Sequence, residues 1–259
     1  MLPNKAKTPW HKLVDKKQQQ LKALIPAEYL LPNSPSTEAS STNVLSLVAN
    51  SVSYYERQIT ELPLHSLLNA LCQGQLTSQE VLAAFFHRAV IAHQLVGEHI
   101  YTSTTLADKH QTSCLSEIHY LAAQRRAQEL HAYWRCHRSP IGPLHGLPVS
   151  LMDRFHVAQL DSACGFASWT GNARSESDEG ALVASLRRLG AVIYCKTAVP
   201  MSMMVLSSVS LVFTANALQM GETANNLTGN TTNPYNVRLS AGGACGGMVV
   251  VTTCCLNTF

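Results

Sequence analysis

The sequence predicts a layered α/β fold, and two features of its second half carry the prediction. Residues 180–190 (GALVASLRRLG) have the apolar spacing of an amphipathic helix that ends at Gly190. This helix leads directly into residues 191–195 (AVIYC), a short apolar run typical of a buried strand. A helix joined to a strand through one glycine is an αβ unit of a layered sheet. A second strand is predicted over residues 146–152 (GLPVSLM).

The first 140 residues are predicted to be mainly helical. Residues 10–24 form a polar helix, and a Pro- and Ser-containing extended segment follows it. Residues 65–74 form a short helix that ends at Gly74. We therefore predict a helical and extended arm over residues 1–64 and a partial enzyme-sized domain over residues 65–259.

Two longer helices are expected inside that domain. Thr77 and Glu80 have the spacing of a capping box ahead of the apolar-periodic residues 81–95. Residues 116–134 predict a further helix. Its expected core-facing stripe consists of Leu121, Ala127, Leu130 and Trp134.

Composition narrows the class of protein. The chain has 259 residues, 46% of them hydrophobic, 14% charged, and a formal net charge of +3. This hydrophobic content excludes a disordered chain. The net charge is too small to favour nucleic acid or an anionic membrane as the main partner. The first 20 residues are polar and basic without an apolar run, so we expect no secretory signal peptide and a cytoplasmic protein.

The cysteines and the apolar segments indicate neither a metal site nor a membrane span. The eight cysteines contain no CxxC pair and no metal-like spacing, so free thiols in a reducing compartment are expected. Residues 197–221 carry no charge, but their Ser, Thr, Asn and Gln residues argue against a transmembrane helix. We therefore predict no metal, no cofactor and no membrane.

The glycine loop, defined here as residues 241–247 (AGGACGG), is the main candidate for a ligand-binding segment. Its members Gly242, Gly243, Gly246 and Gly247 permit close backbone approach to a ligand or to a neighbouring element. A phosphate cradle is excluded because the loop lacks the GK[ST] ending. From the loop alone, a binding role and a purely structural role both stay open.

Seven sequence blocks that occur in a fixed order favour a binding role for the glycine loop over a purely structural one. Besides the polar helix and the capped helix above, they are IGPLHGLPVSLMDRF, DSACGFASWTG, GALVASLRRLGAVIYCKTAVP, GETANNLTGNTTNPYN and the glycine loop. The series resembles the amidase signature family, and within it the fungal acetamidase-like enzymes. The resemblance extends from about Trp10 to Gly247. It implies an α/β/α fold around a mixed sheet, present as an N-terminal portion, and hydrolysis of a carboxamide to an acid and ammonia or an amine.

The resemblance also implies a catalytic device of a nucleophilic serine, a bridging serine with a cis peptide bond, and a neutral lysine. The lysine position corresponds to Met152, and the bridging serine to Ala244. Met203 corresponds to a residue that lines the substrate pocket, and a core methionine is the equal alternative. The nucleophile of the family would follow a couple of dozen positions after the glycine loop, beyond Phe259.

Both substitutions remove chemistry that the device needs. A thioether cannot act as a base, and alanine has no hydroxyl to relay a proton. Loss of acid–base assistance typically slows a reaction by about 10²–10⁴-fold. Cys245 is not expected to replace the nucleophile, because no histidine follows His156 to lower the pKa of its thiol. The sequence therefore predicts no amide hydrolysis by this chain.

Three segments depart from the family pattern. Residues 96–111 and 205–219 each interrupt a matching block, begin with valine and end with glutamine, as a translated in-frame intron would. Residues 248–259 are expected to depart from the family directly after the glycine loop.

Three functions follow from these observations. The first is an amidase-family hydrolase by descent that is truncated and inactive. The second is a working amidase that is misrepresented by a faulty gene model. The third is a non-catalytic amide-binding or regulatory protein on the amidase scaffold. In each case the expected ligand is a small carboxamide.

Overall fold

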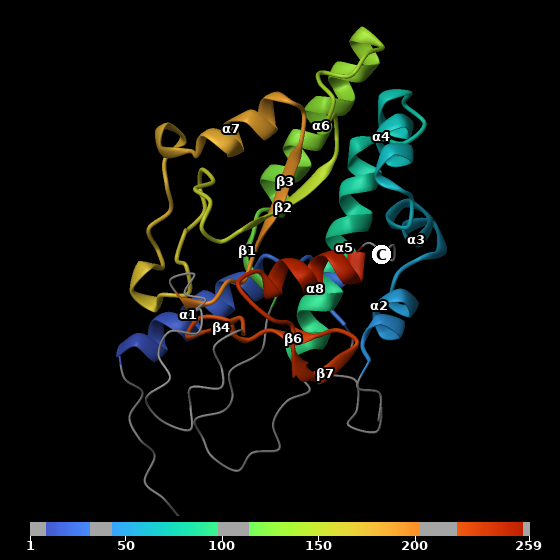
Figure 1. Ribbon diagram of the computed structural model, residues 1–259. Coiled ribbons are helices and arrows are strands. Elements are labelled where there is room, and N and C mark those ends of the chain that lie inside the picture. The colour runs from blue at the N-terminus through green and yellow to red at the C-terminus, as the bar shows by residue number, and fades with distance from the viewer. Residues whose placement is uncertain (1–8, 32–42, 98–113, 202–221, 256–259) are drawn as a thin grey trace, which may run out of the picture.

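The computed structural model describes residues 9–31, 43–97, 114–201 and 222–255 (Figure 1). The helices are α1 (Pro9–Ala23), α2 (Leu45–Ser51), α3 (Tyr54–Thr60), α4 (Leu64–Cys72), α5 (Ser78–Gly97), α6 (Tyr120–His137), α7 (Ala181–Arg188) and α8 (Gly246–Cys255). Short 3₁₀ turns are η1 (Ala27–Tyr29), η2 (Ala167–Trp169) and η3 (Glu176–Asp178).

A mixed three-stranded sheet lies at the centre of the described residues. It consists of β1 (Leu115–Ile118), β2 (Pro148–Met152) and β3 (Val192–Thr197) in the order β1-β3-β2. Strand β3 pairs antiparallel with β1 and parallel with β2. Two small hairpins follow, β4 (Ala224–Asn225) with β5 (Gly229–Asn230), and β6 (Thr232–Asn233) with β7 (Asn236–Ser240).

Helices cover both faces of this sheet, as the α/β/α prediction requires. The larger core joins α5, α6 and α8 to one face of β3 through side chains such as Phe86, Leu130, Tyr194 and Val251. A smaller core on the other face joins α7 to β2 and β3, with Val183 and Ile193 at its centre. All six residues of β3 are buried, as expected for a strand enclosed between two layers of helices.

Several predicted elements are confirmed. The polar helix is α1, the capped helix is α5, and the αβ unit consists of α7 followed by β3. The predicted capping box is present: Thr77 Oγ1 accepts from the Glu80 N–H at 3.1 Å, and the Glu80 carboxylate accepts from the Thr77 N–H at 2.9 Å. Gly190 links α7 to β3 with a φ of +95°, a conformation that favours glycine.

The prediction of a helix over residues 116–134 is wrong at its start. Residues 115–118 form β1, because their pairing with β3 and complete burial outweigh the helical spacing of the apolar residues, and α6 begins only at Tyr120. Leu121 is 66% exposed, so it does not belong to the core-facing stripe, whereas Ala127 and Leu130 are buried as predicted. Trp134 packs instead over Gly74, and its indole N–H donates to the Cys72 carbonyl at 2.9 Å.

The β-branched run after the glycine loop lies in a helix. Residues Val249–Val251 belong to α8, which buries Val250, Val251, Cys254 and Cys255 against the larger core. Burial in the core therefore outweighs the β-propensity of this run.

Residues on both sides of position 64 contribute to the larger core, and Val48 and Ile59 pack there together with residues of α5. The predicted domain boundary at residue 64 remains a prediction. Within the part of the chain that the structure places, no helix combines the length and apolar character needed to cross a bilayer. Most of the uncharged segment 197–221 lies outside that part.

Candidate active site

The fold brings Met152 and the glycine loop together, although Met152 and Ser240 at the end of β7 are 88 positions apart in the sequence. Strand β2 ends at Met152, and the loop runs from β7 into the first turn of α8. The Cys245 thiol donates to the Met152 sulfur over 3.2 Å. One pleat earlier on β2, the Ser150 hydroxyl donates to the Met248 sulfur over 3.9 Å. Two residues that follow Ala244, Cys245 in the loop and Met248 in α8, therefore contact the last residues of β2.

Thr223 holds the glycine loop in shape. Its hydroxyl donates to the Gly242 carbonyl at 2.8 Å and accepts from the Gly246 N–H at 2.9 Å. Gly242 has a φ of +81°, and the Gly243–Ala244 peptide bond is cis. One side chain thus ties both ends of the bend, which the glycine pattern alone did not indicate.

Two glycines of the loop are needed for close packing. A Cβ at Gly246 would lie 2.4 Å from the Thr223 Oγ1, and one at Gly247 would lie 2.4 Å from the Ala198 nitrogen. The Gly247 N–H also donates to the Ala198 carbonyl at 3.2 Å. The loop is therefore seated on the segment that follows β3, and the structural reading of these glycines applies to Gly246 and Gly247.

The side chains at the two key positions cannot carry out acid–base chemistry. Met152 is half-buried and presents a thioether, and Ala244 presents a methyl group. Neither can accept and return a proton near neutral pH. In the described ranges, no group of three or more His, Cys, Asp or Glu residues could hold a metal ion.

A buried ion network lies directly beside this centre and was not predicted. We use that name for Lys17, Glu117, Asp153, Asp161 and Lys196. Lys196 is completely buried; its ammonium lies 3.0 Å from the Asp153 carboxylate and donates to the Ser162 hydroxyl at 2.9 Å. Asp153 follows Met152 in the chain, so Met152 and the network are immediate neighbours.

Lys17 links helix α1 to the same network. Its ammonium lies 2.7 Å from the Asp161 carboxylate and 2.5 Å from that of Glu117. Burial lowers the pKa of Lys17, but the two carboxylates outweigh burial and the net pKa is raised. Burial raises the pKa of Glu117 to about 7, although Lys17 opposes that change. Burial likewise acts to raise the pKa of Asp161, yet hydrogen bonds from Lys17 and the Gly171 N–H hold it below its usual value.

Lys196 of the network lies next to Met152 in the sheet register, and its ammonium is bound by acceptors of the network. Lys196 pairs with Leu151 in the β2–β3 register and Thr197 pairs with Met152. The Lys196 ammonium also donates to the Asp161 carbonyl at 2.5 Å, so it is held among acceptors of the network. Its ammonium is thus bound by the Asp153 carboxylate, the Ser162 hydroxyl and the Asp161 carbonyl.

The remaining predicted positions are partly outside the described residues. Met203 lies there, and so do most of residues 96–111 and 205–219. The structure therefore places Met152, Ala244 and the four loop glycines, and leaves the role of Met203 as a prediction.

Comparisons with known proteins agree on one family. The family description Amidase matches residues 100–256. The chain is 36% identical over 240 residues to an acetamidase of Emericella nidulans, which covers 92% of this chain and 37% of that protein. It is 32% identical over 250 residues to the putative amidase kk1C of Curvularia clavata, covering 96% of this chain and 40% of that protein.

The fold agrees with the sequence relatives. A solved fatty acid amide hydrolase superposes with a TM-score of 0.76 at 28% identity, covering 95% of this chain and 38% of that structure. The chain thus spans about 37–40% of the length of the curated relatives named above. The family match extends to residue 256, so the prediction that residues 248–259 leave the family after the glycine loop is wrong for residues 248–256.

Proposed function

Because this chain belongs to the amidase family, we propose that it is a carboxamide hydrolase by descent that no longer hydrolyses amides. In this proposal it keeps a small-carboxamide ligand, uses no cofactor and is cytoplasmic. The observation that carries the proposal is the pair of substitutions at Met152 and Ala244.

The arrangement of these positions supports the proposal. The resemblance assigns the base to position 152 and the proton relay to position 244. The contact of Met152 with Cys245 at 3.2 Å places position 152 next to the residue that follows position 244. Two neighbouring positions of one proton pathway therefore lack a titratable or hydroxyl group. Since a serine hydroxyl is a weak nucleophile until a base takes its proton, loss of both groups disables the pathway at its first step.

Ammonia release tests the proposal directly. The purified chain is incubated with acetamide or benzamide, and we expect no ammonia above a protein-free blank. The matched control is a Lys16→Met variant, which removes an exposed lysine and leaves the candidate site untouched. Release of ammonia by the unmodified chain would overturn the proposal.

A second function, a working amidase, is supported by the 36% identity to an acetamidase across 92% of the chain. Sequencing of the full transcript across codons 90–115, 200–225 and 240 onward tests it. A transcript that lacks the codons for residues 96–111 and 205–219 and continues in frame favours a working enzyme. A transcript that matches the present sequence leaves a non-catalytic amide-binding role, measured by titration calorimetry with benzamide.

A further inference from the structure

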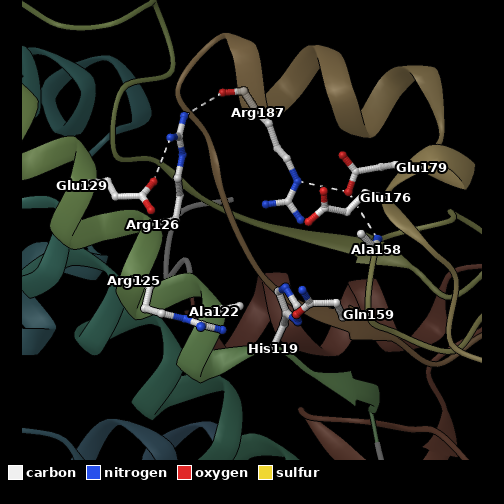
Figure 2. A pocket seen from close by; sticks show the side chains of 10 residues that line it. All are labelled: His119, Ala122, Arg125, Arg126, Glu129, Ala158, Gln159, Glu176, Glu179 and Arg187. Carbon is white, nitrogen blue, oxygen red and sulfur yellow. Dashed lines mark hydrogen bonds and ion pairs between the residues drawn. The ribbon is translucent and has the colours of Figure 1, made fainter.

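A cavity of about 440 Å³ lies between α6, α7 and the loop that contains Ala158 and Gln159 (Figure 2). Neither Met152 nor any residue of the glycine loop lines it. Its volume falls within the range of about 300–1,000 Å³ that is typical of small-molecule sites. The cavity is therefore a separate feature from the candidate active site.

Two ion pairs in the cavity wall are internally neutral. Arg187 Nε lies 3.1 Å from the Glu179 carboxylate, which also accepts from the Ala158 N–H at 3.2 Å. Arg126 lies 3.2 Å from Glu129 and donates to the Arg187 carbonyl at 3.1 Å. These contacts join α6 to α7 and leave little net charge for a ligand.

Two further charged residues of the cavity wall do not form such ion pairs. Arg125 on α6 and Glu176 in η3 are exposed, and neither side chain forms a hydrogen bond or ion pair with another residue of the described ranges. Figure 2 shows them on different walls, with Arg125 on the α6 side and Glu176 beside α7. Among the residues that the structure places, the cavity wall thus carries one cation and one anion that are not paired with each other or with a neighbour.

The first turn of α6 adds hydrogen-bond donors on the Arg125 side. The N-cap residue His119 makes no side-chain cap bond, so the N–H groups of Tyr120, Leu121 and Ala122 have no capping partner. Such N–H groups, with the helix dipole, favour a negatively charged ligand group. Arg125 lies one turn further along α6.

His119 adds a polar side chain without a protein partner to the cavity wall. The residue is only 8% exposed, and its ring has no hydrogen-bond partner among the residues that the structure places. Its ring nitrogens are not among the fully buried polar atoms that lack a partner, so a small molecule in the cavity can reach them. Figure 2 shows the ring at the cavity, next to the Gln159 amide. Burial, and then the nearby Arg187 and Arg125, lower the pKa of His119 to about 4, so the neutral ring can both donate and accept.

We propose that this cavity binds a zwitterionic α-amino acid. The carboxylate of the ligand lies against Arg125 and the first turn of α6, and its ammonium group lies against Glu176. A purely anionic ligand would leave Glu176 facing a like charge, and a purely cationic ligand would do the same to Arg125. His119 and Gln159 supply hydrogen bonds to the polar groups between the two charges.

Titration calorimetry of the whole chain with L-serine tests the proposal. The comparison ligands are glycerate, in which a hydroxyl replaces the ammonium group, and L-serine methyl ester, in which the carboxylate is blocked. None of the three is a carboxamide, so binding at the candidate active site does not interfere. We expect L-serine to bind at least about tenfold more tightly than either comparison ligand.

Three variants test which ligand group each of the two charged side chains, Arg125 and Glu176, binds. Arg125→Gln is expected to remove the preference for L-serine over its methyl ester, and Glu176→Gln the preference over glycerate. Arg188→Gln is the matched control, because Arg188 lies on α7 outside the cavity and hydrogen-bonds only to Ser185 in the described chain. Equal binding of all three ligands, no binding of L-serine, or an equal loss in the control would each overturn the proposal. Benzamide binding measured on the same variants is expected to stay unchanged, which separates this site from the proposed function.

Discussion

Met152 and Asp153 are consecutive residues at the end of β2, but they belong to two regions of opposite character. Met152 adjoins the glycine loop, where its sulfur contacts the Cys245 thiol. Asp153 is almost completely buried and forms an ion pair with the buried Lys196. A thioether can occupy the first position without leaving any charge uncompensated. A neutral residue at either end of the ion pair would leave the other charge buried alone, so the second region constrains the sequence for stability.

The largest expected effect is that of Lys196→Met. Removal of one partner from a buried ion pair typically destabilises a protein by about 3–5 kcal/mol, because the remaining charge stays desolvated. The free energy of unfolding, measured by urea denaturation, is expected to fall by that amount. The control is Lys16→Met on the exposed side of α1, with a change of less than about 0.5 kcal/mol. A loss below about 1 kcal/mol in Lys196→Met would remove the distinction between the two regions.

Gly247→Ala is expected to have the next largest effect. The new Cβ would lie 2.4 Å from the Ala198 backbone nitrogen, so backbone must shift, at a cost of roughly 1–3 kcal/mol. Gly180→Ala is the matched control, since its Cβ meets nothing closer than 3.6 Å. Urea denaturation of both variants is the measurement. Equal stabilities would show that the glycine loop is not seated on the residues after β3.

The pH dependence of the buried ion network gives a smaller and more specific effect. Burial raises the pKa of Glu117 from 4.5 to about 7. The folded protein therefore binds this proton more tightly than the unfolded chain, and its contribution to stability is full below pH 4.5 and is lost as the pH rises through 7. Asp161 has a lowered pKa and contributes the opposite slope, which appears only as the pH falls below its usual value of 3.8.

The Glu117→Gln variant isolates this contribution. The difference in unfolding free energy, wild type minus variant, is expected to decrease between pH 4.5 and pH 7, measured by urea denaturation at intervals of half a pH unit. Lys17 faces Glu117 and remains charged throughout this range, because its own pKa is raised. A difference that is constant, or that grows with pH, would contradict the assignment.

Met152→Leu is expected to have the smallest effect of the series. The exchange conserves volume and removes only the sulfur contact with Cys245, so it costs less than about 1.5 kcal/mol. Thermal and urea denaturation measure the change. A destabilisation as large as that of Lys196→Met would mean that the substituted position, and not its charged neighbour, maintains the local fold.

Local signals predicted those parts of the fold that depend on neighbouring residues. The capping box of Thr77 and Glu80 marked the start of α5, and the apolar run after Gly190 marked β3. Strand β1 was missed, because four residues that are buried by pairing with a distant strand carry no alternating pattern of their own.

The same distinction between local and long-range signals applies to the candidate site. The glycine pattern and the residue at position 152 were visible in the sequence, and the structure places them together. The clamp by Thr223 and the ion network were not, since Lys17 and Asp161 are 144 residues apart and only the fold joins them. A charged residue inside an otherwise apolar strand, as Lys196 is, was the one local sign of the network.

The packing of Trp134 over Gly74 gives the protein an internal optical reporter. Its indole connects the end of α4 to the last turn of α6 through the hydrogen bond to the Cys72 carbonyl. Trp10 and Trp169 are 37% and 52% exposed, so water already quenches and red-shifts their emission in the folded state. A blue-shifted component of the tryptophan fluorescence therefore comes from Trp134 and reports on one contact between two helices. The loss of this component during unfolding shows when α4 separates from α6.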